Sequence, residues 1–131
     1  PQARSPTNAN NAKTGSRHMQ DKIHFPLADA AREPTTEGRL SAAIWSRGQV
    51  DLRYYRPVGV DQQTPHDRDE LYFVATGSGT FVCGDARTDF VSGDLLFAPA
   101  GAEHRFEDFS DDFAVWVMFY GPTGGEQPAP E

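Results

Sequence analysis

The chain is poor in cysteine and contains no long hydrophobic run. Cys83 is the single cysteine, which excludes an internal disulfide and a cysteine-rich zinc site. No apolar segment approaches the roughly 18 residues that span a bilayer, and the N-terminus lacks the hydrophobic stretch of a secretory signal. We therefore expect a cytoplasmic protein in a reducing compartment, with no membrane partner.

Positive charge is also scarce. The 131 residues include 12 Lys and Arg against 19 Asp and Glu, which gives a formal net charge of -7. Residues 1–22 hold four of the basic residues and one acidic residue, so 8 basic and 18 acidic residues, a charge of -10, remain in the rest. Such acidity argues against a nucleic-acid partner. The length allows one domain.

The two ends differ in composition from the middle. Residues 1–18 are rich in Asn, Ser, Thr and Pro, which is typical of disorder, and residues 15–19 (GSRHM) resemble the remainder of an expression tag before an initiator methionine. We expect residues 1–18 to be a tag or disordered arm; a natural flexible arm is the alternative. Residues 19–40 are predicted to form an N-terminal extension, and residues 121–131, with three Gly and three Pro, a flexible tail.

The extension contains an apolar segment. Ile23, Phe25 and Leu27 alternate with other residues, which predicts a piece lying along a sheet edge. Residues 27–32 could form one helical turn before Pro34. Because an exposed strand edge must be covered, we expect a homodimer whose interface uses residues near 23–27 and the adjacent sheet face.

The middle of the chain, residues 41–120, shows short aromatic and β-branched segments broken by Gly, Asp and Pro, with no helical periodicity. This pattern predicts an all-β fold, a single small antiparallel β-barrel or jelly roll. The predicted strands are Ala42–Ser46, Val50–Arg56, Glu70–Thr76, Gly79–Val82, Arg87–Val91, Asp94–Ala98, His104–Phe106 and Phe113–Tyr120.

Three residues that could bind a metal lie at the ends of these strands: His66, Glu70 and His104. His66 and Glu70 are separated by an even number of residues, so on an extended backbone both side chains can point to one face. Two imidazoles and one carboxylate form a triad that leaves positions open for water, dioxygen or substrate. The intervening residues 67–69 are interpreted as a solvated loop with an Arg–carboxylate contact rather than as ligands.

At these positions the sequence resembles the cupin superfamily. Residues 64–77 are similar to its first motif and residues 93–104 to its second, with the family's spacing. The matched positions are His66, Glu70 and Gly77 in the first motif and Gly93, Pro99, Gly101 and His104 in the second. Together the motifs cover about residues 59–108, and the resemblance implies the family's barrel and a metal site inside it.

Two positions depart from the family's pattern. Thr64 stands where the family usually has its first His, so the resemblance implies two His and one Glu instead of three His and one Glu. Gln62 or Gln63 could supply a fourth ligand through a side-chain oxygen, although we expect none. Asp108 replaces an Asn that often ends the second motif. Six further residues are expected to be mainly core: Tyr54, Tyr72, Phe97, Phe106, Trp116 and Met118.

An open metal position admits two classes of function. One is a mononuclear metalloenzyme of the oxygenase, isomerase or lyase type, acting on a small organic acid or sugar-like molecule. The other is a non-catalytic module that binds or senses a small ligand through its metal. The fold does not separate them. Two His and one carboxylate favour Fe(II), with Mn, Ni, Zn and Cu as alternatives.

Overall fold

The computed structural model describes residues 22–130 of the chain. The expectation that residues 1–18 are a tag or arm therefore lies outside the described residues. The elements, in chain order, are α1 (Leu27–Arg32), β1 (Ala42–Arg47), β2 (Val50–Tyr55), β3 (Asp69–Thr76), β4 (Ser78–Cys83), β5 (Ala86–Val91), β6 (Leu95–Ala98), β7 (His104–Glu107) and β8 (Ala114–Tyr120). The all-β prediction is confirmed, and each predicted strand is present with bounds shifted by one residue at most.

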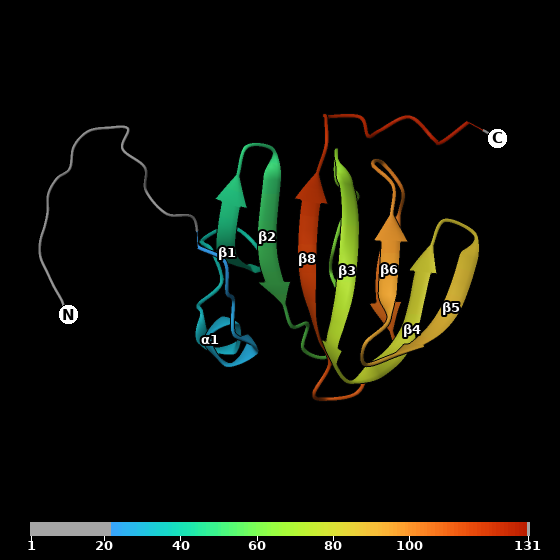
Figure 1. The fold of residues 1–131 in the computed structure, drawn as a ribbon. Coiled ribbons are helices and arrows are strands. Elements are labelled where there is room, and N and C mark those ends of the chain that lie inside the picture. Colours follow the sequence, from blue (N-terminus) through green and yellow to red (C-terminus); the bar gives the residue numbers. More distant parts are fainter. Residues whose placement is uncertain (1–21, 131) are drawn as a thin grey trace, which may run out of the picture.

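The strands form two antiparallel sheets, which gives a jelly roll (Figure 1). The larger sheet has five strands in the order β1-β2-β8-β3-β6, and the smaller has three in the order β5-β4-β7. In residues 22–130 no strand ladder joins the two sheets into a closed barrel. No helix among these residues has the length and apolar character needed to cross a membrane.

Alternation along the strands buries one face of the larger sheet. In β8, Val115, Val117 and Phe119 are buried, whereas Trp116 and Met118 between them are only partly so. Successive side chains on a strand point to opposite faces, so the buried set points toward the smaller sheet. The core cluster comprises Tyr55, Tyr72, Val74, Phe81, Phe90, Ala98, Phe106, Phe113, Val115, Val117 and Phe119.

Gly77 carries the chain from the larger sheet to the smaller. It lies between β3 and β4 with a φ of +87°, in the left-handed region that glycine tolerates best. A Cβ atom at this position would lie 2.6 Å from the Cα atom of Phe113. The turn therefore requires glycine for its backbone conformation and for its close packing, which explains the Gly of the first motif.

The N-terminal extension covers part of the outer face of the larger sheet. Residues 27–32 form the expected helical turn, α1, in which Ala30 packs on Tyr54 and Ala114. The sheet-edge expectation for residues 23–27 is wrong, because no strand forms there. The ring of Phe25 instead lies 5.4 Å from that of Trp45, and Pro26, which has no N–H for a ladder, is the N-cap of the helix.

Candidate metal centre

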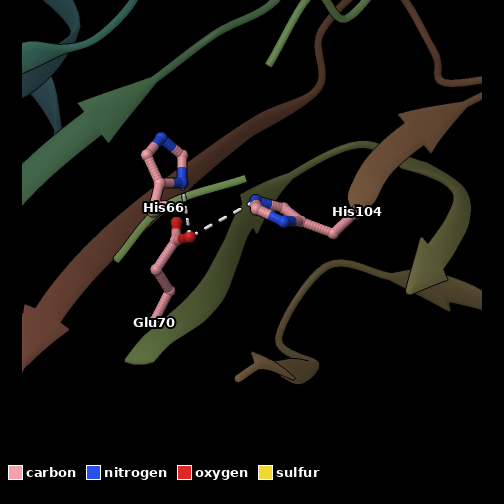
Figure 2. Close-up of side chains that lie close together, drawn as sticks. All are labelled: His66, Glu70 and His104. Atoms are coloured by element: carbon pink, nitrogen blue, oxygen red, sulfur yellow. Dashed lines mark hydrogen bonds and ion pairs between the residues drawn. The ribbon is translucent and has the colours of Figure 1, made fainter. Parts of the chain in front are cut away.

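The structure brings His66, Glu70 and His104 together (Figure 2). Glu70 is the second residue of β3, and His104 is the first residue of β7 in the other sheet. His66 lies in the loop before β3, where its carbonyl accepts a hydrogen bond of 2.7 Å from the Gly101 N–H. The two motifs therefore meet because the loop of the first is bonded to the turn of the second.

The ligand atoms of these three residues form a compact group. One oxygen of Glu70, Oε2, lies 2.6 Å from Nδ1 of His66 and 3.3 Å from Nε2 of His104. All three ligand atoms lie within 4.8 Å of one another. Glu70 and His104 are buried, and His66 is partly exposed. The group therefore has two buried members and one that reaches toward solvent.

The contacts of His104 fix which ring nitrogen is free. Its Nδ1 lies 2.9 Å from the carbonyl oxygen of Ala102, and because a carbonyl only accepts, Nδ1 carries the proton. In the neutral ring Nε2 then has a lone pair. This atom is buried and makes no hydrogen bond, because Oε2 of Glu70, 3.3 Å away, is also an acceptor. A lone pair of this kind, with the other nitrogen bonded to a carbonyl, suits a metal ligand.

The second oxygen of Glu70 is held separately. Its Oε1 accepts a hydrogen bond of 2.7 Å from the hydroxyl of Tyr72, two residues along β3 on the same face. Burial and the Glu70 charge raise the pKa of Tyr72 well above the ordinary tyrosine value, so the phenol keeps its proton. Tyr72 therefore fixes one carboxylate oxygen and leaves the other for the two histidines.

A buried carboxylate, Asp61, organises the loop that precedes the site. Its Oδ1 accepts from the Tyr55 hydroxyl at 2.5 Å, and its Oδ2 accepts from the Phe106 N–H at 2.8 Å. The Gln63 side-chain amide donates to Oδ2 at 2.8 Å, which leaves the Gln63 oxygen 3.2 Å from the hydroxyl of Tyr72. Gln63 thus contacts Asp61 and Tyr72, and neither of these contacts involves the three candidate ligands.

Beside the three candidate ligands lies a pocket of about 270 Å³. His66 and Glu70 line it, together with Gln62 and Thr64 from the same loop. A pocket of this size could hold a small metabolite. Thr64 also lines a neighbouring hollow that His104 borders, so the residue that departs from the family's pattern lies close to the candidate ligands.

The interpretation of residues 67–69 as a solvated loop is wrong for Asp69. This side chain is buried, and its oxygens accept from the N–H groups of Ala100 and Glu126, each at 2.9 Å. Arg68 donates to the carbonyl of Gln49 and contacts no carboxylate of this loop. Because an aspartate at the start of a strand can accept from neighbouring backbone, Asp69 joins β3 to the second motif and to the chain after β8.

Three residues around the site escaped the sequence reasoning: Asp61, Gln63 as a hydrogen-bonding residue, and Tyr72. The signal for Tyr72 was present, since a residue two positions after Glu70 in a strand shares its face. No signal in the sequence marks Asp61, because two of its partners, Tyr55 on β2 and Phe106 on β7, lie on other elements.

The fold and this cluster define a small jelly-roll protein with two histidines and one glutamate gathered between its sheets. Residues 53–120 match the Cupin domain family, and this span is just over half of the chain. The chain therefore belongs to the cupin family.

One sequence relative and two solved structures illustrate what the chain is similar to, and the two structures share its fold. An uncharacterized protein of Streptomyces coelicolor is 39% identical over 62 residues, which are 47% of this chain and 59% of that protein. A crystal structure from Neisseria meningitidis superposes with a TM-score of 0.58 at 15% identity, over 77% of this chain and all of that one. An RmlC-like cupin from Methanocaldococcus jannaschii, with a double-stranded β-helix fold, has a TM-score of 0.57 at 14% identity, over 82% and 95%.

Proposed function

We propose that this protein binds one divalent transition metal through His66, Glu70 and His104 and acts as a small-molecule metalloenzyme. The observation that carries the proposal is the buried, unpartnered Nε2 of His104, which faces Glu70 in a cluster of three candidate ligand groups. An unpaired buried polar atom is costly, and a cation would satisfy it. The donor set of two imidazoles and one carboxylate favours Fe(II), with Mn, Ni, Zn and Cu as alternatives.

The residues of the chain have separate roles in this proposal. The metal would supply Lewis-acid or dioxygen chemistry of the oxygenase, isomerase or lyase type. Tyr72 holds its proton at the hydroxyl and fixes Oε1 of Glu70. Asp61 and Gln63 hold the loop that carries His66. The adjacent pocket gives a small molecule access to the site.

One observation favours a non-catalytic binding or sensing module as the second candidate. Apart from His66 and Glu70, the pocket is lined by only two ionisable side chains, Arg39 and Tyr55. Tyr55 donates to Asp61, and burial and that hydrogen bond raise its pKa above the ordinary tyrosine range. No separate acid–base pair therefore lines the pocket. Turnover in a metabolite screen with metal-loaded protein would separate the two functions.

Elemental analysis of protein purified without added metal tests the metal site. We expect about one metal per chain in the wild type and none in His66→Ala, Glu70→Ala or His104→Ala. All three variants should fold, because the core consists of other residues. His24→Ala, which removes an exposed histidine, is the matched control and should keep its metal. Full occupancy in any two of the ligand variants would overturn the assignment.

We further propose a homodimer that uses residues near 23–27 and the outer face of the larger sheet. Large apolar side chains lie exposed in two parts of this region, Ile23 near the β1 edge of the sheet and Phe73, Leu95 and Phe97 on β3 and β6 toward the other edge. Burying such a surface against a second copy is favourable. Light scattering should give a dimer mass for the wild type and a monomer for the double variant Ile23→Lys/Leu95→Lys, which changes an exposed residue in each part of the surface. A monomeric wild type would exclude the dimer.

A further inference from the structure

The pocket beside the candidate metal centre is lined by few charged side chains. When the histidines are neutral, two of the residues that line the pocket carry a formal charge, Arg39 and Glu70. Within residues 22–130, no carboxylate lies at ion-pair distance from Arg39. A divalent cation bound at Glu70 would give the lining a net charge of +2, in a protein whose total charge is -7.

Arg39 lines this pocket because a built turn holds it there. The turn spans residues 36–41, in which the Thr36 N–H donates to the Ser41 carbonyl at 3.0 Å and the Arg39 N–H to the Thr36 carbonyl at 2.8 Å. Arg53, buried on β2, fastens both ends of the turn. Its guanidinium donates to the hydroxyl of Ser41 at 2.6 Å and to that of Thr36 at 2.7 Å. Arg53 therefore anchors the backbone of the turn, from which the exposed Arg39 side chain borders the pocket.

The two arginines differ in how their charge is balanced. Arg53 has a carboxylate nearby, with its NH1 3.7 Å from Asp51. Burial lowers the pKa of Arg53, and the positive charge of Arg39 lowers it further. The charges of the two guanidinium groups therefore repel each other, and an anion at Arg39 would relieve this repulsion.

We propose that the ligand of this pocket is a small organic anion, whose carboxylate pairs with Arg39 while its other end reaches the His66–Glu70–His104 site. This inference rests on the proposed function for the metal and narrows its substrate class from organic acids or sugars to organic acids. A planar guanidinium binds a carboxylate through two parallel hydrogen bonds.

The rest of the lining agrees with a ligand that has a short apolar middle. Leu40 from the turn, and Val117 and Phe119 from β8, supply apolar side chains to the pocket. A sugar carries hydroxyl groups around its ring, and some of these would lose hydration against such walls. The volume of about 270 Å³ limits the ligand to a small molecule.

Calorimetric titration of Zn²⁺-loaded protein tests the inference, because zinc is redox-inert and reports binding without turnover. The probes are acetate, pyruvate, malonate and succinate, with malonamide, glycerol and xylose as neutral probes. The proteins are the wild type, Arg39→Gln, Arg39→Lys and Arg32→Gln. Arg32, an exposed residue of α1, is the matched control because its replacement removes the same charge.

We expect at least one carboxylate to bind the wild type and Arg32→Gln equally. Binding to Arg39→Gln should be at least about tenfold weaker, the size expected for a lost charge-assisted hydrogen bond. Arg39→Lys should be intermediate, since lysine keeps the charge and loses the planar fork. Equal binding to the wild type and Arg39→Gln, no carboxylate binding at all, or tighter binding of a neutral probe would overturn the inference.

The metal content of each protein separates this inference from the proposed function. We expect the same zinc stoichiometry in the wild type and Arg39→Gln, because Arg39 is not a ligand. If the wild type takes up no metal, the proposed function fails. The same titrations on metal-free protein then test the role of Arg39 alone. Carboxylate binding that depends on Arg39 would still support that role, and no such binding would overturn it.

Discussion

The aromatic core and the polar cluster of this jelly roll are built in contrasting ways. The aromatic core consists of Phe81, Phe90, Phe106, Phe109 and Phe113, and the polar cluster of Asp61, Gln63, His66, Glu70 and His104. In the core, rings from β4, β5, β7 and the loop between β7 and β8 meet at centroid distances of 4.8–5.7 Å. In the cluster, directional hydrogen bonds of 2.6–2.8 Å set the geometry.

The difference assigns stability to one region and chemistry to the other. Apolar contacts are non-directional, so the aromatic core stabilises the fold without fixing a particular atom. The polar cluster holds buried charge and an unpartnered nitrogen, which is a cost to folding. Tyr72 joins the two regions, because its ring packs on Phe81 and Phe106 while its hydroxyl bonds Glu70.

Phe113→Ala should break the core and show the largest effect. Phe113 is fully buried, and its ring lies 4.8 Å from Phe106 and 5.0 Å from Phe90. Removing such a ring leaves a cavity, and we expect a loss of about 3–5 kcal/mol in the free energy of unfolding. Urea unfolding measures it, with Val58→Ala as the control, and the loss should be small there because Val58 is 85% exposed. A loss below about 1 kcal/mol for Phe113→Ala would contradict this account of the core.

The sequence predicted the strands better than the core, since Phe97, expected in the core, is exposed. Strand alternation and turn glycines are local signals, so all eight strands could be placed before the structure was known. The packing of Phe25 on Trp45 was missed, because the alternation at residues 23–27 resembles that of a strand. An alternating pattern indicates which residues are apolar, but it does not indicate whether the backbone of the segment forms hydrogen bonds with a neighbouring strand.

The candidate site was predicted in part, for a similar reason. His66, Glu70 and His104 could be selected because motif spacing fixes them, and the structure brings them together. Asp61 could not be selected, since it bonds Tyr55, Gln63 and Phe106, which lie at different distances along the chain. Hydrogen bonds between distant segments depend on the final fold, and residue type alone does not specify them.

Raising the pH tests the burial of Tyr55 and Tyr72, whose hydroxyl groups contact the polar cluster. The expected effect on stability is smaller than that of Phe113→Ala. Burial raises the folded-state pKa of both Tyr55 and Tyr72, whereas an unfolded tyrosine titrates near about 10. Stability from these groups is therefore complete below about pH 10 and is lost above it, by up to about 1.4 kcal/mol per pH unit for each tyrosine.

Urea unfolding at several pH values from about 8 to 11, together with tyrosinate absorbance, measures this loss. Two of the four tyrosines should stay protonated until the protein unfolds. Tyr72→Phe should reduce the slope of stability against pH by about one proton. Equal slopes in the wild type and Tyr72→Phe would show that Tyr72 is not buried as described.

Thr64→His changes the polar cluster and leaves the aromatic core intact. Of the predicted substitutions it should have the smallest effect on stability. Thr64 lines the pocket with His66 and also the hollow that His104 borders, so an imidazole there should add a ligand. We expect metal affinity to rise by about tenfold, or roughly 1.4 kcal/mol, and small-molecule binding to weaken because an open position is filled. Competition with a chelator measures the first effect and calorimetry the second. Thr88→His, on the exposed strand β5, is the control and should change neither. Unchanged metal affinity in Thr64→His would mean that this side chain does not face the candidate site, and that the departure of Thr64 from the family's pattern leaves the ligand set unaffected.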